Sequence, residues 1–215
     1  MLVGERMSRP VITVPPEMPV IDAISLMKTN NIRRTPVTKN EKMIGIVSDR
    51  DLLNASPSRT TSLSVWEINY LLTKITISEV MTKTVLTVTE HTPIEEAALI
   101  MAENKIGGLP VMHDQELVGI ITETDLFKVF LELLGAREEG VRVTAMIPEK
   151  PGMLASITQK IAKAGGNFIA FGQFKGQDDA SFLLTFKVEG LNEKQVRELL
   201  DPVVLRITDI RTCCP

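Results

Sequence analysis

The sequence is poor in the residues from which cross-links and metal sites are built. Its 215 residues include two cysteines, two histidines and one tryptophan, and aromatic residues make up 4%. Cys213 and Cys214 are neighbours near the C-terminal end, where they cannot join distant parts of a fold, so we expect reduced thiols. A redox or metal-binding role for this adjacent pair is the alternative. The sequence predicts no other metal site.

Blocks of one charge and long hydrophobic runs are also missing. The 24 basic and 27 acidic residues are interspersed, which argues against a nucleic-acid partner. No apolar stretch approaches the roughly 18 residues of a membrane-spanning helix. The first residues, 1–6, lack a basic leader followed by an apolar run, so we expect a cytoplasmic protein without a membrane partner. A hydrophobic content of 44% predicts a packed core.

The sequence contains no recognisable catalytic arrangement. His91 and His113 both lie in polar segments, where a single exposed imidazole is ordinary. A phosphate-binding Gly-Lys motif, a nucleophile elbow and a Cys/His cluster are all missing. We therefore predict that the chain is not an enzyme and holds no catalytic cofactor.

What the sequence does contain is an internal repeat. A shift of 74 residues aligns residues 5–53 with 79–127 without a gap, and 16 of the 49 pairs are identical. Chance would give roughly three identities at ordinary amino-acid usage. The first two thirds of the chain are therefore a duplication.

Each copy has the pattern of a β-α-β-β-α unit. A β-rich run at 11–14 or 85–88 precedes Pro19 or Pro93, a residue typical of a helix start, and an apolar stripe of helical spacing follows. Two short strands and a second helix complete each copy. These predicted elements are strands at 35–38, 43–48, 109–112 and 117–122 and helices at 49–54 and 123–134.

The rest of the chain divides into a connector and a third unit. Residues 61–77 predict a connecting helix in which Trp66 and Tyr70 serve as packing residues. Residues 140–215 predict a βαββαβ domain, a ferredoxin-like arrangement. Its predicted elements are strands at 141–147, 167–174, 180–188 and 203–211 and helices at 154–164 and 192–200. The overall class is therefore α+β.

The strongest local signal is Gly-Ile-Val-Ser-Asp-Arg-Asp at 45–51, which is repeated as Gly-Ile-Ile-Thr-Glu-Thr-Asp at 119–125. In one interpretation, each hydroxyl residue and the acid three positions later merely cap a helix. In the other, the same helix start and hydroxyl bind a phosphate while the carboxylate accepts from a ribose diol. The sequence leaves both interpretations open.

The duplicated pattern, including Ile-Arg-Arg-Thr-Pro-Val at 32–37, resembles a pair of CBS domains, a Bateman module. The third unit, with Pro-Gly at 151–152 and Gly-Gly-Asn at 165–167, resembles an ACT domain. Together they are similar to the acetoin-utilisation proteins of the AcuB type. The implied domains are residues 1–60 and 78–136 for the repeats, 61–77 for the connector and 140–215 for the ACT domain.

This resemblance implies a regulatory protein with two clefts for AMP, ADP, ATP or S-adenosylmethionine. In it, Asp51 and Asp125 would hold ribose hydroxyls, and Ser48 and Thr122 would face phosphates. The residues implied to border the base are Thr13, Ile32, Pro36, Thr87, Ile106 and Pro110.

The two clefts are not expected to be equivalent. Arg33 and Arg34 of the first copy are replaced in the second by Gly107 and Gly108, so one copy alone supplies guanidinium groups. We therefore predict one phosphate-preferring cleft and one weaker or differently selective cleft. Solvated arginines without a ligand are the alternative.

The resemblance to ACT domains implies an amino-acid site near residues 149–152 and Asn167. Glu149 stands where that family commonly has aspartate, which favours pairing of two ACT units through a free sheet edge over amino-acid binding. We therefore expect a homodimer and leave any partner protein open. A module that only assembles and an amino-acid sensor are the alternative functions.

Overall fold

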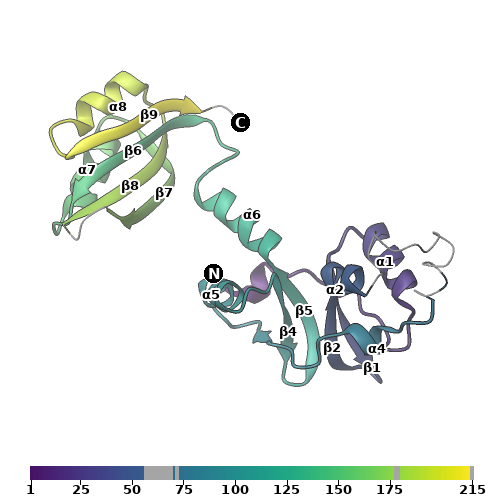
Figure 1. The fold of residues 1–215 in the computed structure, drawn as a ribbon. Helices are drawn as coiled ribbons and strands as arrows, with labels where there is room; N and C mark the ends of the chain where they lie inside the picture. The colour runs from purple at the N-terminus through teal and green to yellow at the C-terminus, as the bar shows by residue number, and fades with distance from the viewer. Residues whose placement is uncertain (56–69, 71–72, 177–179, 214–215) are drawn as a thin grey trace. The chain divides into compact units, whose positions relative to one another are not determined.

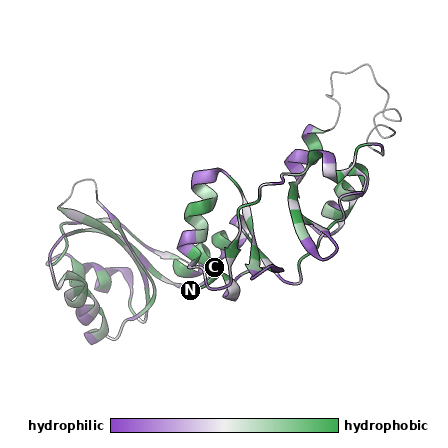
Figure 2. Cartoon of the chain, turned by 90° about the horizontal axis from the view of Figure 1, so that it is seen from below, coloured by the Kyte–Doolittle hydropathy of each residue, from purple (hydrophilic) through white to green (hydrophobic). Residues whose placement is uncertain are grey.

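The chain divides into two units, residues 1–126 and 127–215. The computed structural model describes residues 1–55, 70, 73–176 and 180–213. Both units combine helices with antiparallel strands, which confirms the predicted α+β class (Figure 1). Helices in both units carry hydrophilic as well as hydrophobic residues, as helices with one buried face do (Figure 2).

The first repeat is built around a two-stranded antiparallel sheet. Helix α1 begins directly after Pro19 and buries Val20, Ala23 and Met27, which follow the spacing of one helix face. These side chains form a core with residues from the strands that follow. The elements are η1 (Val3–Glu5), α1 (Val20–Thr29), β1 (Arg34–Lys39), β2 (Lys42–Ser48) and α2 (Asp49–Asn54).

The second repeat follows the same plan with the same register. Gly108 pairs with Thr122 as Arg34 pairs with Ser48, in agreement with the shift of 74 residues. Its sheet has a third strand, β3, which runs parallel to β4. The elements are α4 (Ile77–Val80), β3 (Val88–Thr89), α5 (Ile94–Asn104), β4 (Gly108–His113), β5 (Glu116–Thr122) and α6 (Glu123–Leu133).

The first residues of each repeat pack on the other repeat. Val3 is fully buried in the core of the second repeat, and Ile77 is fully buried in the core of the first. Backbone hydrogen bonds of 2.9 Å fix both segments to strands of the opposite repeat. The corresponding bridges join Ser8 with Ile120 and Ile46 with Thr82. The two repeats are therefore interlocked.

The C-terminal unit is a four-stranded antiparallel sheet in the order β7-β8-β6-β9. Buried residues of α7 and α8, among them Ile157, Ile161 and Leu200, form one core with Phe186 and other strand residues. Asn192 caps α8 through the backbone N–H of Gln195. The elements are β6 (Gly140–Pro148), α7 (Met153–Lys163), β7 (Asn167–Lys175), β8 (Ser181–Glu189), α8 (Glu193–Leu200) and β9 (Arg206–Cys213).

A buried lysine holds the segment that follows α6. Lys187 on β8 is only 4% exposed, and its Nζ donates to the carbonyl oxygens of Gly135 at 2.8 Å and Glu138 at 2.7 Å. These two acceptors compensate for the loss of water around the ammonium group.

Several sequence predictions require correction. Residues 11–14 are not a strand, because only Val14 forms an isolated bridge, and the run predicted at 85–88 is paired only at β3. The last strand begins at Arg206 rather than at residue 203, because turns occupy the residues between α8 and β9. Cys213 has an unpaired thiol, and Cys214 lies outside the described residues.

Most of the predicted connecting helix, including Trp66, also lies outside the described residues. Tyr70 is described, and the prediction that it packs in a core is wrong, since it is 63% exposed with the Lys74 ammonium 5.3 Å from its ring centre. Within the described ranges, the helices are too short or too polar to span a membrane.

Candidate functional site

The two hydroxyl-to-acid motifs have the same hydrogen-bonding geometry. Asp51 Oδ2 accepts from the backbone N–H of Ser48 at 2.8 Å and from its hydroxyl at 2.7 Å. Asp125 Oδ2 accepts from the N–H of Thr122 at 3.0 Å and from its hydroxyl at 2.7 Å. Both acids therefore close the turn between a strand and the helix that follows it.

This geometry confirms the capping interpretation for Ser48, which also accepts from the backbone N–H of Asp51 at 3.3 Å. The Ser48 hydroxyl gives its one hydrogen to Asp51, so it has no donor left for a phosphate in this conformation. Asp51 Oδ1, in contrast, makes no hydrogen bond with any residue that the structure describes. Capping therefore leaves one carboxylate oxygen available as an acceptor.

A cleft of about 620 Å³ opens beside Asp51 and is lined by both repeats. The first repeat contributes Ile46 and residues 48–51, and the second contributes residues 82, 84–86 and 104–108. Ile46, Ile106 and Leu86 form an apolar wall in which Leu86 is 44% exposed. An acidic acceptor beside exposed apolar surface suits a ligand with a hydroxylated part and a flat hydrophobic part.

Arg34 reaches from the first repeat across the cleft to the second. Its guanidinium donates to the carbonyl oxygen of Gly107, and its side chain occupies the space that a Cβ at Gly107 or Gly108 would need. An ideal Cβ at residue 107 would stand 2.1 Å from Arg34 Nη2 and 2.6 Å from Glu123 Oε2. Burial lowers the pKa of the Arg34 guanidinium, and the charge of Glu123 partly offsets this effect. Only glycine leaves room for this arrangement.

Four of the predicted site residues line this cleft, namely Arg34, Ser48, Asp51 and Ile106. The others are not among its lining residues: Thr13, Ile32, Arg33, Pro36, Thr87, Pro110, Thr122 and Asp125. Pro36 and Pro110 are buried within β1 and β4. Thr87 lines a different cleft of about 600 Å³.

The side chains of the two arginines make different contacts, and one phosphate-preferring cleft stays a prediction. Arg34 lines the Asp51 cleft, whereas Arg33 Nη2 donates to Thr124 Oγ1 at 3.1 Å, inside the second hydroxyl-to-acid motif. Successive residues of an extended chain point to opposite sides, which separates the two side chains.

Sequence reasoning missed the residues that the second repeat brings to the Asp51 cleft. Glu123 and Lys105 carry charge there, and Thr84 and Leu86 form part of the wall. Lys105 ends α5 in the left-handed region, with a φ of 55°. The start of α2 in the first repeat and the start of β4 in the second line the same cleft. A search for this arrangement between the two repeats could have identified these residues.

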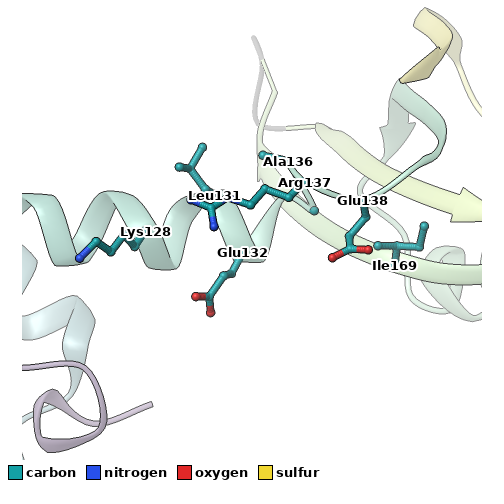
Figure 3. A pocket seen from close by; sticks show the side chains of 8 residues that line it. Lys128, Leu131, Glu132, Ala136, Arg137, Glu138 and Ile169 are labelled. Carbon is teal, nitrogen blue, oxygen red and sulfur yellow. The ribbon is translucent and has the colours of Figure 1, made fainter. Parts of the chain in front are cut away.

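Cavities also lie among the described residues of the C-terminal unit. One of about 430 Å³ lies between the end of α6, the segment after it and β7, and Lys128, Glu132, Arg137 and Glu138 give it mixed charge (Figure 3). Another, of about 460 Å³, is lined by residues 147–155 and includes the predicted segment 149–152 but not Asn167. Groups of three or more metal-ligating side chains do not occur in the described part of the chain.

Comparison with known proteins identifies the interlocked repeats. A family model described as CBS domain matches residues 3–58 and 77–132. The chain belongs to the CBS-domain family. The second match therefore includes α6 up to residue 132.

The CBS domains of this chain are similar to those of longer enzymes. Inosine-5'-monophosphate dehydrogenase of Thermoplasma acidophilum is 35% identical over 119 residues, which cover 55% of this chain. That match spans 21% of the dehydrogenase, so the chain corresponds to about a fifth of this relative's length.

Solved structures of CBS-domain pairs resemble this chain as well. A putative acetoin utilization protein, AcuB, from Vibrio cholerae is 34% identical with a TM-score of 0.52, and the match covers 64% of this chain and 98% of that one. The CBS pair of protein MJ0100, in complex with 5'-methylthioadenosine and S-adenosylmethionine, is 30% identical with a TM-score of 0.51 and coverages of 60% and 95%. CBSX2, in complex with AMP, is 29% identical with a TM-score of 0.50 and coverages of 60% and 96%.

Proposed function

We propose that this protein is a regulatory CBS protein that binds an adenine nucleotide or S-adenosylmethionine in the Asp51 cleft. The observation that carries the proposal is the position of Asp51 beside an apolar wall that includes Ile106 and Leu86, with the cationic Arg34 at the same cleft. These three chemistries match the ribose diol, the adenine ring and an anionic group. The adenosine ligands of the MJ0100 and CBSX2 structures support the assignment.

In this proposal the adenosine ribose donates to the open oxygen of Asp51, and the adenine ring lies against Ile46, Ile106 and Leu86. A second and weaker site is proposed at Thr122 and Asp125. The contact of Arg33 with Thr124 supports it, because it brings residue 33 of the first repeat to the second motif. On the family resemblance, the residues further proposed to border the adenine ring are Thr13, Ile32, Pro36, Thr87 and Pro110.

Regulation follows from binding by thermodynamic coupling. A ligand shifts a protein between conformations only to the extent that it prefers one of them. The interlocked repeats provide such a dependence, since the cleft is formed by residues of both and changes if they move. The proposed protein is therefore a sensor that carries out no reaction of its own.

Calorimetric titration of the full chain with AMP, ATP and S-adenosylmethionine tests this proposal. We expect saturable binding of at least one ligand. Asp51→Asn keeps a side-chain acceptor for the helix cap but removes the charge, and we expect it to weaken binding about tenfold or more. Asp22→Asn on the exposed face of α1 is the matched control and should bind as the wild type does. Absence of saturable binding for all three ligands would overturn the proposal.

The C-terminal unit is proposed to be an ACT domain. Its strand order, the two helices on one face and the glycines at 152 and 165 in the left-handed region support this assignment. The cavity at residues 147–155 makes amino-acid sensing a second candidate function. A thermal-shift screen of the 20 amino acids tests it, and no stabilisation by any of them would remove it.

Assembly is a further candidate role, favoured by exposed hydrophobic residues on α6. Phe127 is 66% exposed, Phe130 47% and Leu133 58%. Such a row is typical of a surface that another chain covers, and we propose a homodimer. Sedimentation at several protein concentrations, with and without AMP, separates an assembly role from a sensing role.

The proposed cellular role is regulation of acetoin utilisation, which the AcuB neighbour from Vibrio cholerae supports. We expect a strain that lacks this protein to grow more slowly on acetoin than on glucose, relative to its parent. Equal growth of both strains on acetoin would contradict the role without affecting the proposed ligand.

A further inference from the structure

The Asp51 cleft is balanced in charge. Its lining includes three cationic side chains and three anionic ones, which leaves no net formal charge. The cations are Arg34, Arg50 and Lys105, and the anions are Asp49, Asp51 and Glu123. In a balanced cleft, the loss of a single charge leaves a net charge of the opposite sign.

The six charges do not have equal weight. Arg50, Lys105, Asp49 and Glu123 are exposed to solvent, whereas Arg34 is half-buried. Water and salt screen the charges at the surface more strongly than a charge that is partly removed from water. Arg34 is therefore the cation with the largest effect on a ligand in this cleft.

Glu123 is the acid placed to oppose Arg34. Atoms of both side chains lie within 3 Å of the point where a Cβ of residue 107 would stand, on the strand-start segment of the second repeat. The charge of Glu123 is the largest electrostatic influence on Arg34 after its burial. An anionic group that enters this space approaches Arg34 and Glu123 together.

We propose that Arg34 and Glu123 set which adenosine ligand the Asp51 cleft selects, with Arg34 favouring phosphate-bearing ligands and Glu123 favouring a cationic one. This inference rests on the proposed function of the cleft. AMP carries nearly two negative charges at neutral pH, whereas S-adenosylmethionine carries a sulfonium cation. The two ligands share adenosine, so their affinity ratio isolates the charged part.

Arg34 has to exchange partners when a phosphate binds. In the described conformation its guanidinium donates to the Gly107 carbonyl oxygen, a neutral acceptor. A phosphate oxygen is charged and forms a stronger hydrogen bond with guanidinium than a neutral carbonyl does. Binding of AMP therefore withdraws Arg34 from the second repeat, whereas binding of S-adenosylmethionine leaves that contact in place.

Calorimetric titration of the full chain with AMP and with S-adenosylmethionine tests the assignment. Arg34→Gln should lower the affinity for AMP about tenfold or more, and should leave the affinity for S-adenosylmethionine unchanged or higher. Glu123→Gln should shift the affinity ratio in the opposite direction, by about threefold, because that carboxylate is exposed. The double variant should return the ratio toward that of the wild type.

Control variants separate charge at this cleft from charge in general. Arg211→Gln and Glu198→Gln remove the same charges from exposed positions in the C-terminal unit and should leave the ratio unchanged. Gly107→Ala retains every charge but fills the space that Arg34 Nη2 occupies without ligand, so it should leave AMP binding unchanged or make it tighter. Circular dichroism confirms that each variant is folded.

The outcomes distinguish this inference from the proposed function. If the wild type binds AMP or S-adenosylmethionine, but Arg34→Gln weakens both equally or neither, the charge assignment is wrong and the adenosine site stands. If the wild type binds neither ligand, both proposals fail. A ratio that moves in opposite directions in the two single variants supports the assignment.

Discussion

The two repeats share a backbone plan and differ in what they place on it. Asp51 and Asp125 accept equivalent hydrogen bonds, yet Asp51 is partly exposed beside a cleft and Asp125 is only 6% exposed. Arg34 of the first repeat crosses to the glycines that occupy the equivalent positions of the second. The turn is therefore the same in both repeats, whereas its acid is partly exposed in the first and buried in the second.

The largest expected difference between the repeats is in the loss of stability when the contact that each makes with the other is disturbed. A Cβ at Gly45 would stand 2.9 Å from the backbone oxygen of Thr82, which is hydrogen-bonded to Ile46, whereas at Gly119 the three nearest atoms all belong to the Met7 side chain. Backbone in a paired bridge cannot move aside as a flexible thioether can. We expect Gly45→Ala to lower the free energy of unfolding by about 3 kcal/mol and Gly119→Ala by about 1 kcal/mol.

Urea unfolding followed by far-ultraviolet circular dichroism measures both values, and unchanged m-values would show that the same surface unfolds in each variant. Equal midpoints for the two variants would mean that the repeats meet symmetrically. The proposed difference in rigidity between the two contacts would then be wrong.

The next largest expected difference in unfolding free energy comes from the acids at the two helix caps. Removal of a helix-capping side chain costs about 1 kcal/mol, and the loss is larger where the partners it leaves are buried. We therefore expect Asp125→Ala to lower the free energy of unfolding by about 2 kcal/mol and Asp51→Ala by about 1 kcal/mol. The same urea titration measures both. A larger loss in Asp51→Ala would show that burial does not distinguish the two turns.

Local patterns predicted most of the secondary structure, because they depend on neighbours in the chain. The helix after Pro19 and the cap at Ser48 follow from spacing and hydrogen-bonding chemistry within a few residues. The strand predicted from the β-rich run at 11–14 is wrong, because β-propensity reflects packing against a partner strand. Of these residues, only Val14 pairs with a strand.

The candidate site was only half predictable for a related reason. Ser48 and Asp51 were identified from their own motif, but Glu123 and Lys105 reach the same cleft only because each repeat is completed by the other. Packing across the repeats is a tertiary effect with no local signal in the sequence. The separation of Arg33 from Arg34 is a tertiary effect of the same kind.

The hairpins of the two repeats give the smallest expected difference, which appears only as a function of pH. The second repeat pairs His113 Nδ1 with Glu90 Oε2 at 2.8 Å, and the first pairs Lys39 Nζ with Glu17 Oε1 at 3.6 Å. The hydrogen bond that His113 donates to Glu90, and then the charge of Glu90, raise the pKa of His113 above its ordinary value near 6.5. Among ordinary side chains, only histidine changes charge between about pH 5 and pH 8.

A raised pKa in the folded state means that the pair stabilises the protein fully below the unfolded-state pKa, and that this stabilisation is lost as the pH rises through the folded-state pKa. The difference in unfolding free energy between wild type and Glu90→Gln should therefore shrink from about pH 5.5 to about pH 8, while that for Glu17→Gln should stay flat. Titration of the His113 ring proton by NMR, with His91→Gln to assign the signal, measures the pKa directly. A His113 pKa at or below 6.5 would contradict this difference between the hairpins. So would a difference in unfolding free energy between wild type and Glu90→Gln that does not shrink as the pH rises.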